Sequence, residues 1–247
     1  MIDVGALRVK IFADGADLSS MAQLAARSYI RGITTNPTLM RKANIHDYRG
    51  FAQEVLRLVP DRPVSLEVFS DDFDEMERQA YEIASWGPNV NVKIPVTDTR
   101  GEFSDPLIRR LSSAGVMVNV TAVMTVEQVE AIAGCLSEQT KSFVSVFAGR
   151  IADTGRDPIP LLARALEILR GRPASELIWA SPREFLNILQ AHELGCPIIT
   201  VTAELLSKLP LLGKDLTAFS LETVRMFRED AVKAGFAIEV SQPHVVG

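Results

Sequence analysis

The sequence predicts an α/β fold, a single (β/α)8 TIM barrel with an extra C-terminal helix. Short β-branched runs alternate with longer amphipathic stretches about eight times along the chain, which is the pattern of β-then-α units. No linker, low-complexity tract or break in composition interrupts the 247 residues, so we expect one domain over residues 1–247. The alternative is a doubly wound open sheet, but the sequence has no G-x-G-x-x-G or Walker-type phosphate loop to support it.

Each strand is expected where apolar, often β-branched residues form a short run between turn-forming or polar residues. The run 90–96, for example, lies between Gly87-Pro88 and Thr97-Asp98. In chain order the expected strands are 9–13, 32–35, 64–68, 90–96, 116–120, 142–148, 177–180 and 197–201.

Each helix is expected where apolar residues recur at helical spacing between two strands. Ser19, Asp47 and Thr125 stand where N-cap residues are expected. The expected helices are 18–27, 48–58, 73–84, 106–113, 126–135, 159–169, 183–194 and 203–209. A further amphipathic stretch, 221–233, exceeds what a barrel needs, and it could close the barrel bottom or dock on a neighbouring subunit.

Composition restricts the classes of function. The net charge of −5 gives no electrostatic footprint for nucleic acid or an anionic membrane. No apolar run is long enough to span a bilayer, and the first ten residues do not resemble a signal peptide. Cys135 and Cys196 are far apart in apolar settings and are expected to be reduced thiols of a cytoplasmic protein. The three widely separated histidines make a metal site improbable, and we expect no cofactor.

Lys93 is the most informative residue, because it interrupts the apolar run 90–96. Burial disfavours the charged form of an amine, and a neutral lysine amine is what condensation with a carbonyl to a Schiff base requires. The alternative is a lysine whose amine reaches solvent at the strand end or pairs with a carboxylate.

Polar residues follow or end nearly every expected strand, which is where barrels of this kind place their chemistry. Any one of them could be a helix cap or a surface group, and Arg150 could form a salt bridge with Asp153. As a set they form a ring of amine, carboxyl, hydroxyl, amide and guanidinium groups: Asp14, Thr34, Thr35, Asn36, Glu67, Lys93, Thr121, Ser145, Arg150, Ser181 and Arg183. This ring argues against a barrel retained only for binding or scaffolding.

Residue type then predicts the roles. Lys93 is the nucleophile, and Glu67 on the preceding strand manages the proton transfers, with Thr121 holding a relaying water. Asp14 acts separately on a substrate hydroxyl, and Asn36 offers a donor and an acceptor to a polyol. Arg150 and Arg183, with Ser181 at a helix start, are expected to form an anion pocket suited to a phosphate.

These residues belong to short motifs that run in order from about Val9 to Leu209. The most specific are Thr34-Thr35-Asn36-Pro37 and Val92-Lys93-Ile94-Pro95; the others are Phe12-Ala13-Asp14, Glu67-Val68, Asn119-Val120-Thr121, Phe147-Ala148-Gly149-Arg150 and Ala180-Ser181-Pro182-Arg183. With them the chain resembles the transaldolases, especially the small transaldolases grouped with fructose-6-phosphate aldolases. The resemblance implies a class I aldolase barrel with its Schiff-base lysine on the fourth strand, where Lys93 stands.

The resemblance also bears on the reaction. Aldolases of this group carry a tyrosine where Phe147 stands and a glutamine where Glu67 stands, so these two residues favour the transferase. The implied activity is transfer of a three-carbon dihydroxyacetone unit from a ketose phosphate, of the fructose 6-phosphate or sedoheptulose 7-phosphate type, to an aldose. This is chemistry of carbohydrate metabolism and the pentose phosphate pathway. Thr35, Asn36, Ser145, Phe147, Arg150, Ser181 and Arg183 would bind the substrate.

Two alternatives stay open. One is an aldolase that releases free dihydroxyacetone. The other is a transaldolase for a modified sugar, for example a sulfonated one, because the loop 151–158, Gly15-Ala16 and Met124 depart from what is common in the family. The expected partners are small sugar phosphates. Small relatives form rings and decamers, so a homo-oligomer is expected.

Overall fold

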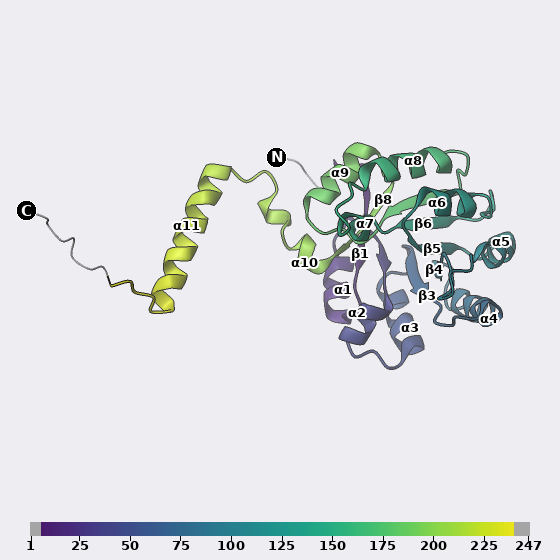
Figure 1. The fold of residues 1–247 in the computed structure, drawn as a ribbon. Coiled ribbons are helices and arrows are strands. Elements are labelled where there is room, and N and C mark those ends of the chain that lie inside the picture. Colours follow the sequence, from purple (N-terminus) through teal and green to yellow (C-terminus); the bar gives the residue numbers. More distant parts are fainter. Residues whose placement is uncertain (1–5, 240–247) are drawn as a thin grey trace, which may run out of the picture. The chain divides into compact units, whose positions relative to one another are not determined.

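Eight parallel strands close into one barrel in the order of the sequence. Figure 1 shows the fold as a ribbon. The computed structural model describes residues 6–239. The predicted (β/α)8 barrel is confirmed, and an additional helix follows it. The strands are β1 (Lys10–Asp14), β2 (Ile30–Thr34), β3 (Val64–Glu67), β4 (Val90–Pro95), β5 (Val118–Val123), β6 (Ser142–Val146), β7 (Ser175–Trp179) and β8 (Ile198–Thr202).

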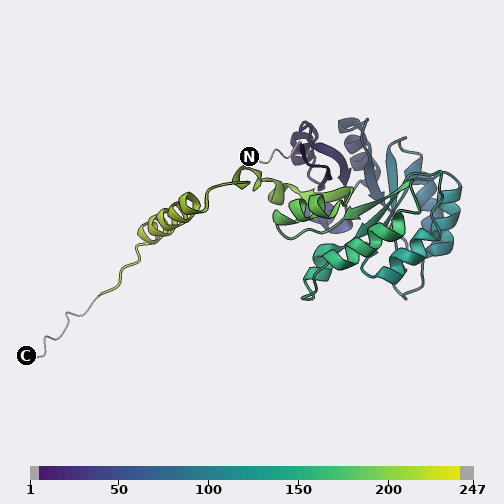
Figure 2. The same ribbon diagram turned by 90° about the horizontal axis from the view of Figure 1, so that it is seen from above.

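Helices connect the strands and lie around the outside of the barrel (Figures 1 and 2). Those between strands are α1 (Leu18–Ala25), α2 (Pro37–Lys42), α3 (Tyr48–Leu58), α4 (Phe73–Ala84), α5 (Asp105–Ser113), α6 (Val126–Ala133), α7 (Ala148–Ala152), α8 (Ile159–Leu169) and α9 (Leu186–Leu194). After the last strand, β8, the chain continues with α10 (Ala203–Leu206), the 3-10 helix η2 (Leu209–Leu211) and α11 (Leu216–Lys233). Within residues 6–239, no helix is both long and apolar enough to cross a membrane.

Some of the expected helices and N-caps agree with the structure, and others do not. Helices α3, α4 and α8 have the expected bounds, and Asp47 and Thr125 cap α3 and α6 as expected. The expected cap Ser19 is wrong: the Asp17 side chain accepts from the Ser20 backbone N–H and begins α1. Helices α2 and α7 were not expected, because each is a single short segment that starts directly after a strand.

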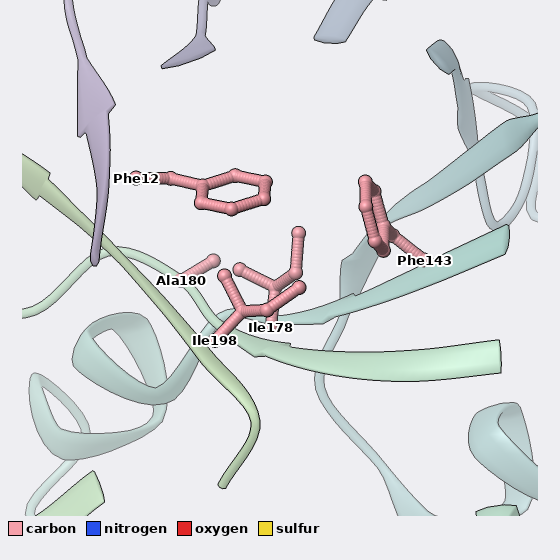
Figure 3. Close-up of a cluster of buried hydrophobic side chains, with 5 residues drawn as sticks. All are labelled: Phe12, Phe143, Ile178, Ala180 and Ile198. Carbon is pink, nitrogen blue, oxygen red and sulfur yellow. The ribbon is translucent and has the colours of Figure 1, made fainter. Parts of the chain in front are cut away.

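The barrel interior changes from apolar to polar along the strands. Phe12, Phe143, Ile178, Ala180 and Ile198 form a buried cluster, shown in Figure 3. The rings of Phe12 and Phe143 meet edge to face with centroids 5.7 Å apart. Since side chains alternate along a strand, the residue two positions after Phe12 faces the same interior, one step nearer the C-terminal end. On β1 that residue is Asp14, so a polar layer follows the apolar one.

The described residues up to Leu209 form one compact unit, and those from Pro210 form another. The second unit contains α11, which begins five residues before the expected 221–233 stretch and has no buried residue. Its exposed apolar side chains include Leu221, Val224 and Phe227. The expectation of one domain over 1–247, with residues 221–233 docked on a neighbouring subunit, stays a prediction.

Candidate active site

The Lys93 side chain lies inside the barrel. It is 8% exposed, and β4 carries it next to Glu67, its register partner on β3. The amine Nζ donates a hydrogen bond to the backbone oxygen of Thr35 and stands 4.0 Å from Glu67 Oε1. Lys93 therefore does not reach bulk water at the strand end, and a carboxyl group stands beside it without forming a tight ion pair.

Glu67 is the buried carboxyl of the site. Its Oε2 accepts a hydrogen bond of 2.8 Å from the Thr35 hydroxyl, whereas its Oε1 has no hydrogen-bond partner among the described residues. Burial raises the pKa of Glu67 above its ordinary value, although the charge of Lys93 and the Thr35 hydrogen bond oppose that rise. A carboxyl whose pKa is raised keeps its proton to a higher pH than a free glutamate does, which suits a general acid–base group.

Asp14 is a second carboxyl at the end of β1. Its Oδ1 accepts from the Thr34 hydroxyl at 2.8 Å, and its Oδ2 accepts from Asn36 Nδ2 at 3.4 Å. The Thr34 oxygen also contacts the Thr200 hydroxyl, which must be the donor because Thr34 gives its proton to Asp14. Burial raises the pKa of Asp14, opposed by the charge of Lys93 and by these hydrogen bonds.

Polar groups of Thr35 and Asn36 are hydrogen-bonded to other residues in and around the site. Thr35 contacts Lys93 through its backbone oxygen and Glu67 through its hydroxyl. The Asn36 oxygen Oδ1 accepts the Leu39 backbone N–H at 2.9 Å and so caps α2. Only the amide nitrogen of Asn36 remains directed at Asp14. The unexpected helix α2 thus uses one acceptor site of the Asn36 oxygen, and the expectation that Asn36 offers a donor and an acceptor to a substrate stays a prediction.

A buried chain of hydrogen bonds lies below Lys93. The Ser145 hydroxyl donates to Asn119 Oδ1 at 2.7 Å, and Asn119 Nδ2 donates to the Ser65 hydroxyl at 3.0 Å. Asn119 is the register partner of Lys93 on β5, and Thr121, two residues further, faces the same interior. Thr121 is partly buried and makes no side-chain hydrogen bond within residues 6–239, so its hydroxyl is available to a water or a substrate.

The two arginines differ in their partners. Arg183 forms an ion pair with Asp153 through both oxygens of the carboxylate, with Nε 2.9 Å from Oδ1. Arg150 is exposed and lies with its guanidinium carbon 6.0 Å from the centre of the Phe147 ring. The sequence allowed a salt bridge between Arg150 and Asp153, but Asp153 pairs with Arg183 instead. Of the two arginines expected in the anion pocket, Arg150 is therefore the one that forms no ion pair within residues 6–239.

Ser181 is not at a helix start. It has a left-handed backbone with φ of 58°, and α9 begins only at Leu186. The helix expected over 183–194 is thus shorter, and no helix N-terminus faces an anion at Ser181. The turn lies so close to α7 that a Cβ at Gly149 would be 1.5 Å from the Ser181 backbone oxygen. Glycine at position 149 is what permits this approach.

Three comparisons place this geometry among known proteins. The family model described as "Transaldolase/Fructose-6-phosphate aldolase" matches residues 11–242. The chain belongs to this family. A "Probable transaldolase" of Dehalococcoides mccartyi is 36% identical over 215 residues, which cover 85% of this chain and 96% of the relative. A "Probable transaldolase" of Thermoanaerobacter sp. is 33% identical over 231 residues, which cover 93% and 100%.

A solved structure of 2,3-dimethylmalate lyase shares the barrel. It has a TM-score of 0.54 and 14% identity and covers 97% of this chain and 89% of that protein. At this identity the likeness concerns the fold alone. Within residues 6–239, no three His, Cys, Asp or Glu side chains gather in a group that could hold a metal ion.

Sequence reasoning assigned no role to several residues that support the site of this transaldolase-family member. Ser65 and Asn119 connect Ser145 to the interior below Lys93, and Thr200 supports Thr34. Tyr48 donates to the backbone oxygen of Glu67 at 3.1 Å. A signal existed for the strand residues, because Ser65 and Asn119 lie two positions before Glu67 and Thr121, and alternation places them on the same face. No such signal exists for Tyr48, which reaches β3 from α3.

Proposed function

We propose that this chain is a transaldolase that transfers a three-carbon dihydroxyacetone unit from a ketose phosphate to an aldose through a Schiff base on Lys93. The observation that carries the proposal is the buried Lys93 amine 4.0 Å from Glu67, a carboxyl whose pKa burial raises. The family match supports an enzyme of the transaldolase or aldolase kind. No metal or cofactor enters the mechanism.

The reaction begins at the C2 carbonyl of the ketose. The Lys93 amine adds to C2 through its lone pair, and a proton passes from the nitrogen to the C2 oxygen to give the carbinolamine. The carbinolamine then loses that oxygen as water when Glu67 supplies a proton. The product is an iminium between Nζ and C2. The Thr35 hydroxyl keeps one Glu67 oxygen engaged, so the other, Oε1, faces the amine and is the oxygen that exchanges protons. Thr121 holds the water that relays them.

Cleavage follows at the other carboxyl. Asp14 removes the proton of the C4 hydroxyl, the C3–C4 bond breaks, and its electron pair moves into the iminium to form an enamine. The aldose phosphate leaves. The enamine then attacks the carbonyl carbon of the acceptor aldose while Asp14 returns a proton to its oxygen. Hydrolysis of the new iminium, assisted by Glu67, releases the product and the amine. Arg150, with Ser181 and Arg183, binds the terminal phosphate.

Borohydride trapping tests this proposal. The protein is mixed with fructose 6-phosphate and reduced, and the modified residue is located by peptide mass spectrometry. We expect one reduced three-carbon adduct on Lys93, none in Lys93→Ala, and an unchanged adduct in the control variant Lys208→Ala, which changes an exposed lysine. An adduct that persists in Lys93→Ala would overturn the assignment of the nucleophile.

A product assay separates the transferase from an aldolase. Turnover of fructose 6-phosphate is measured with and without erythrose 4-phosphate as acceptor. We expect turnover to require the acceptor, because Glu67 and Phe147 are the residues that the resemblance associates with transfer. Free dihydroxyacetone formed at an unchanged rate without acceptor would favour the aldolase. Faster turnover of a sulfonated ketose than of any phosphate would assign the enzyme to a modified sugar.

We also propose that the protein works as a cytoplasmic homo-oligomer in carbohydrate metabolism, in the pentose phosphate pathway. The support for assembly is α11, whose exposed apolar side chains include Phe227, 64% exposed. Light scattering of the full chain should give a mass of several protomers, up to a decamer. Phe227→Glu should lower that mass, whereas Thr217→Glu on the same helix should not. A monomeric wild type would contradict the proposal.

A further inference from the structure

A second cavity lies at the N-terminal end of the barrel, away from Lys93. Its volume is about 970 Å³, and it is lined by the segments that enter β1 to β7. Phe12, Asn91 and Phe143 lie toward its interior, and charged residues of the strand entrances surround them. On β4 the cavity reaches Asn91, whereas Lys93 lies two residues further toward the opposite end. The cavity is therefore separate from the candidate active site.

The cavity is positively charged although the protein as a whole is acidic. Five basic side chains against two carboxylates leave an excess of three positive charges, in a chain whose net charge is −5. A concave site of one sign attracts ions of the other sign more strongly than a flat surface does. The lining residues concerned are Lys10, Arg27, Arg31, Arg62, Lys141, Asp61 and Glu176.

Both carboxylates of the cavity, Asp61 and Glu176, already pair with a basic side chain. Glu176 accepts from the Lys10 amine at 2.7 Å. Asp61 accepts from Arg62 Nε at 3.3 Å, and the Arg62 guanidinium also donates to two backbone oxygens at 2.9 and 3.0 Å. These two basic residues have local structural partners.

The other three basic residues have none within residues 6–239. Arg27, Arg31 and Lys141 are exposed and form no ion pair or side-chain hydrogen bond there. They come from the loop before β2, the second residue of β2 and the residue before β6, so the fold and not one helix face brings them to the same cavity. Three like charges held around one concavity without anionic partners favour a multiply charged anion.

The interior of the cavity is suited to an organic body. Phe12 and Phe143, whose rings meet edge to face (Figure 3), are among the residues that line the cavity. Asn91 is 2% exposed, and its side-chain amide makes only a long hydrogen bond of 3.4 Å to the Asn89 backbone oxygen. A buried polar group with such a weak partner can bind a ligand polar atom at little desolvation cost. Aromatic ring edges beside a side-chain amide suit a planar ligand group that carries nitrogen or oxygen atoms.

We infer that the N-terminal cavity binds an organic anion with at least two negative charges and a planar polar body, the chemistry of a nucleoside polyphosphate. Arg27, Arg31 and Lys141 hold the phosphates, because guanidinium and ammonium donors form charge-assisted hydrogen bonds with them. Asn91 contacts the body. The volume of about 970 Å³ lies at the upper end of the usual range of small-ligand sites, roughly 300–1,000 Å³.

Calorimetric titration of the full-length protein with ATP tests this inference. We expect saturable binding that weakens about 10-fold or more in the variant Arg31→Gln/Lys141→Gln. The matched control Arg41→Gln/Lys208→Gln removes the same charge from exposed residues that do not line the cavity, and it should bind ATP as the wild type does. Thermal unfolding of each variant verifies that it is folded.

Further titrations test which site binds ATP and which chemical class of ligand that site prefers. Adenosine and tripolyphosphate, titrated separately, should each bind more weakly than ATP, and saturating fructose 6-phosphate should not displace ATP. Equal loss of ATP binding in both double variants would overturn the inference, since the effect would be one of overall charge. Displacement by fructose 6-phosphate would place ATP in the active site, and tripolyphosphate binding as tightly as ATP would exclude a role for the aromatic interior.

Discussion

Each end of the barrel places a lysine on one strand near a glutamate on another, but the surroundings of the two pairs differ. At the C-terminal end, Lys93 and Glu67 are 8% and 4% exposed, and their charged atoms stand 4.0 Å apart. At the N-terminal end, the side chains of Lys10 and Glu176 are 39% and 37% exposed and form a direct ion pair. Burial raises the pKa of the Glu67 carboxyl in the first pair, whereas solvent screens the second pair. The same residue types are therefore expected to serve different ends: the proposed chemistry for the buried pair and local structure for the exposed pair.

The largest expected effect comes from exchanging the lysines one at a time. Lys93→Met should lower transaldolase activity on the order of 10⁴-fold or more, because the proposed nucleophile is removed. Lys10→Met is the matched control: activity should persist, and the free energy of unfolding should fall by about 0–1 kcal/mol, as for an exposed ion pair. Activity assays and urea unfolding measure both. Comparable activity losses in the two variants would abolish the contrast between the ends.

Glu67→Gln sharpens the contrast within the buried pair. The amide keeps the shape of the side chain but cannot transfer a proton, so kcat should fall by about 10²–10⁴-fold. The corresponding change at the other end, Glu176→Gln, should leave kcat and KM unchanged. Steady-state kinetics with a ketose phosphate donor and an aldose acceptor measures both. An unchanged kcat in Glu67→Gln would show that another group carries the protons.

Gly149→Ala tests how tightly the loops of the C-terminal end are packed. The added Cβ would be 1.5 Å from the Ser181 backbone oxygen, so the turn or α7 must shift. We expect a loss of about 1–3 kcal/mol in the free energy of unfolding, together with weaker substrate binding, because Arg150 lies in the same helix. Gly171→Ala is the control, since its Cβ would meet no atom closer than 3.8 Å. Equal unfolding midpoints for the two variants would contradict this account of the turn.

The smallest expected effect concerns pH. Since burial raises the pKa of Glu67, the native state binds its proton more tightly than the unfolded state does, and this contribution to stability is lost as pH rises through the folded-state pKa. Glu67→Gln should therefore gain stability relative to wild type as pH rises from acid to neutral. Urea unfolding over a pH series measures the difference.

Asp98→Asn is the control of opposite sign. Burial tends to raise the Asp98 pKa, but hydrogen bonds from the Glu102 and Arg100 backbones and from the Arg100 side chain hold it below its usual range. Its contribution is present above the unfolded-state pKa and is lost in acid. The stability deficit of Asp98→Asn should shrink as pH falls. If Glu67→Gln instead lost stability relative to wild type as pH rises, the sign assigned to Glu67 would be wrong.

Local patterns predicted most of the barrel but not its short connections. The bounds of α3, α4 and α8 follow from amphipathic periodicity, which is strong over eleven or twelve residues. Helices α2 and α7, six and five residues long, are too short for periodicity to show. For the same reason the start of α2 was not predicted, nor was the role of the Asn36 oxygen as its N-cap. The start of α9 was misplaced because the left-handed turn at Ser181 depends on its close approach to Gly149.

By itself the sequence determined the eightfold alternation of strand and helix and the presence of a lysine inside an apolar strand, because both are properties of neighbouring residues. Only the tertiary structure decided which partners these residues have: Thr35 and Glu67 around Lys93, Asp153 for Arg183, and the chain from Ser145 through Asn119 to Ser65. Such partners come from different strands and loops. The distances between them depend on closure of the barrel, which no local pattern encodes.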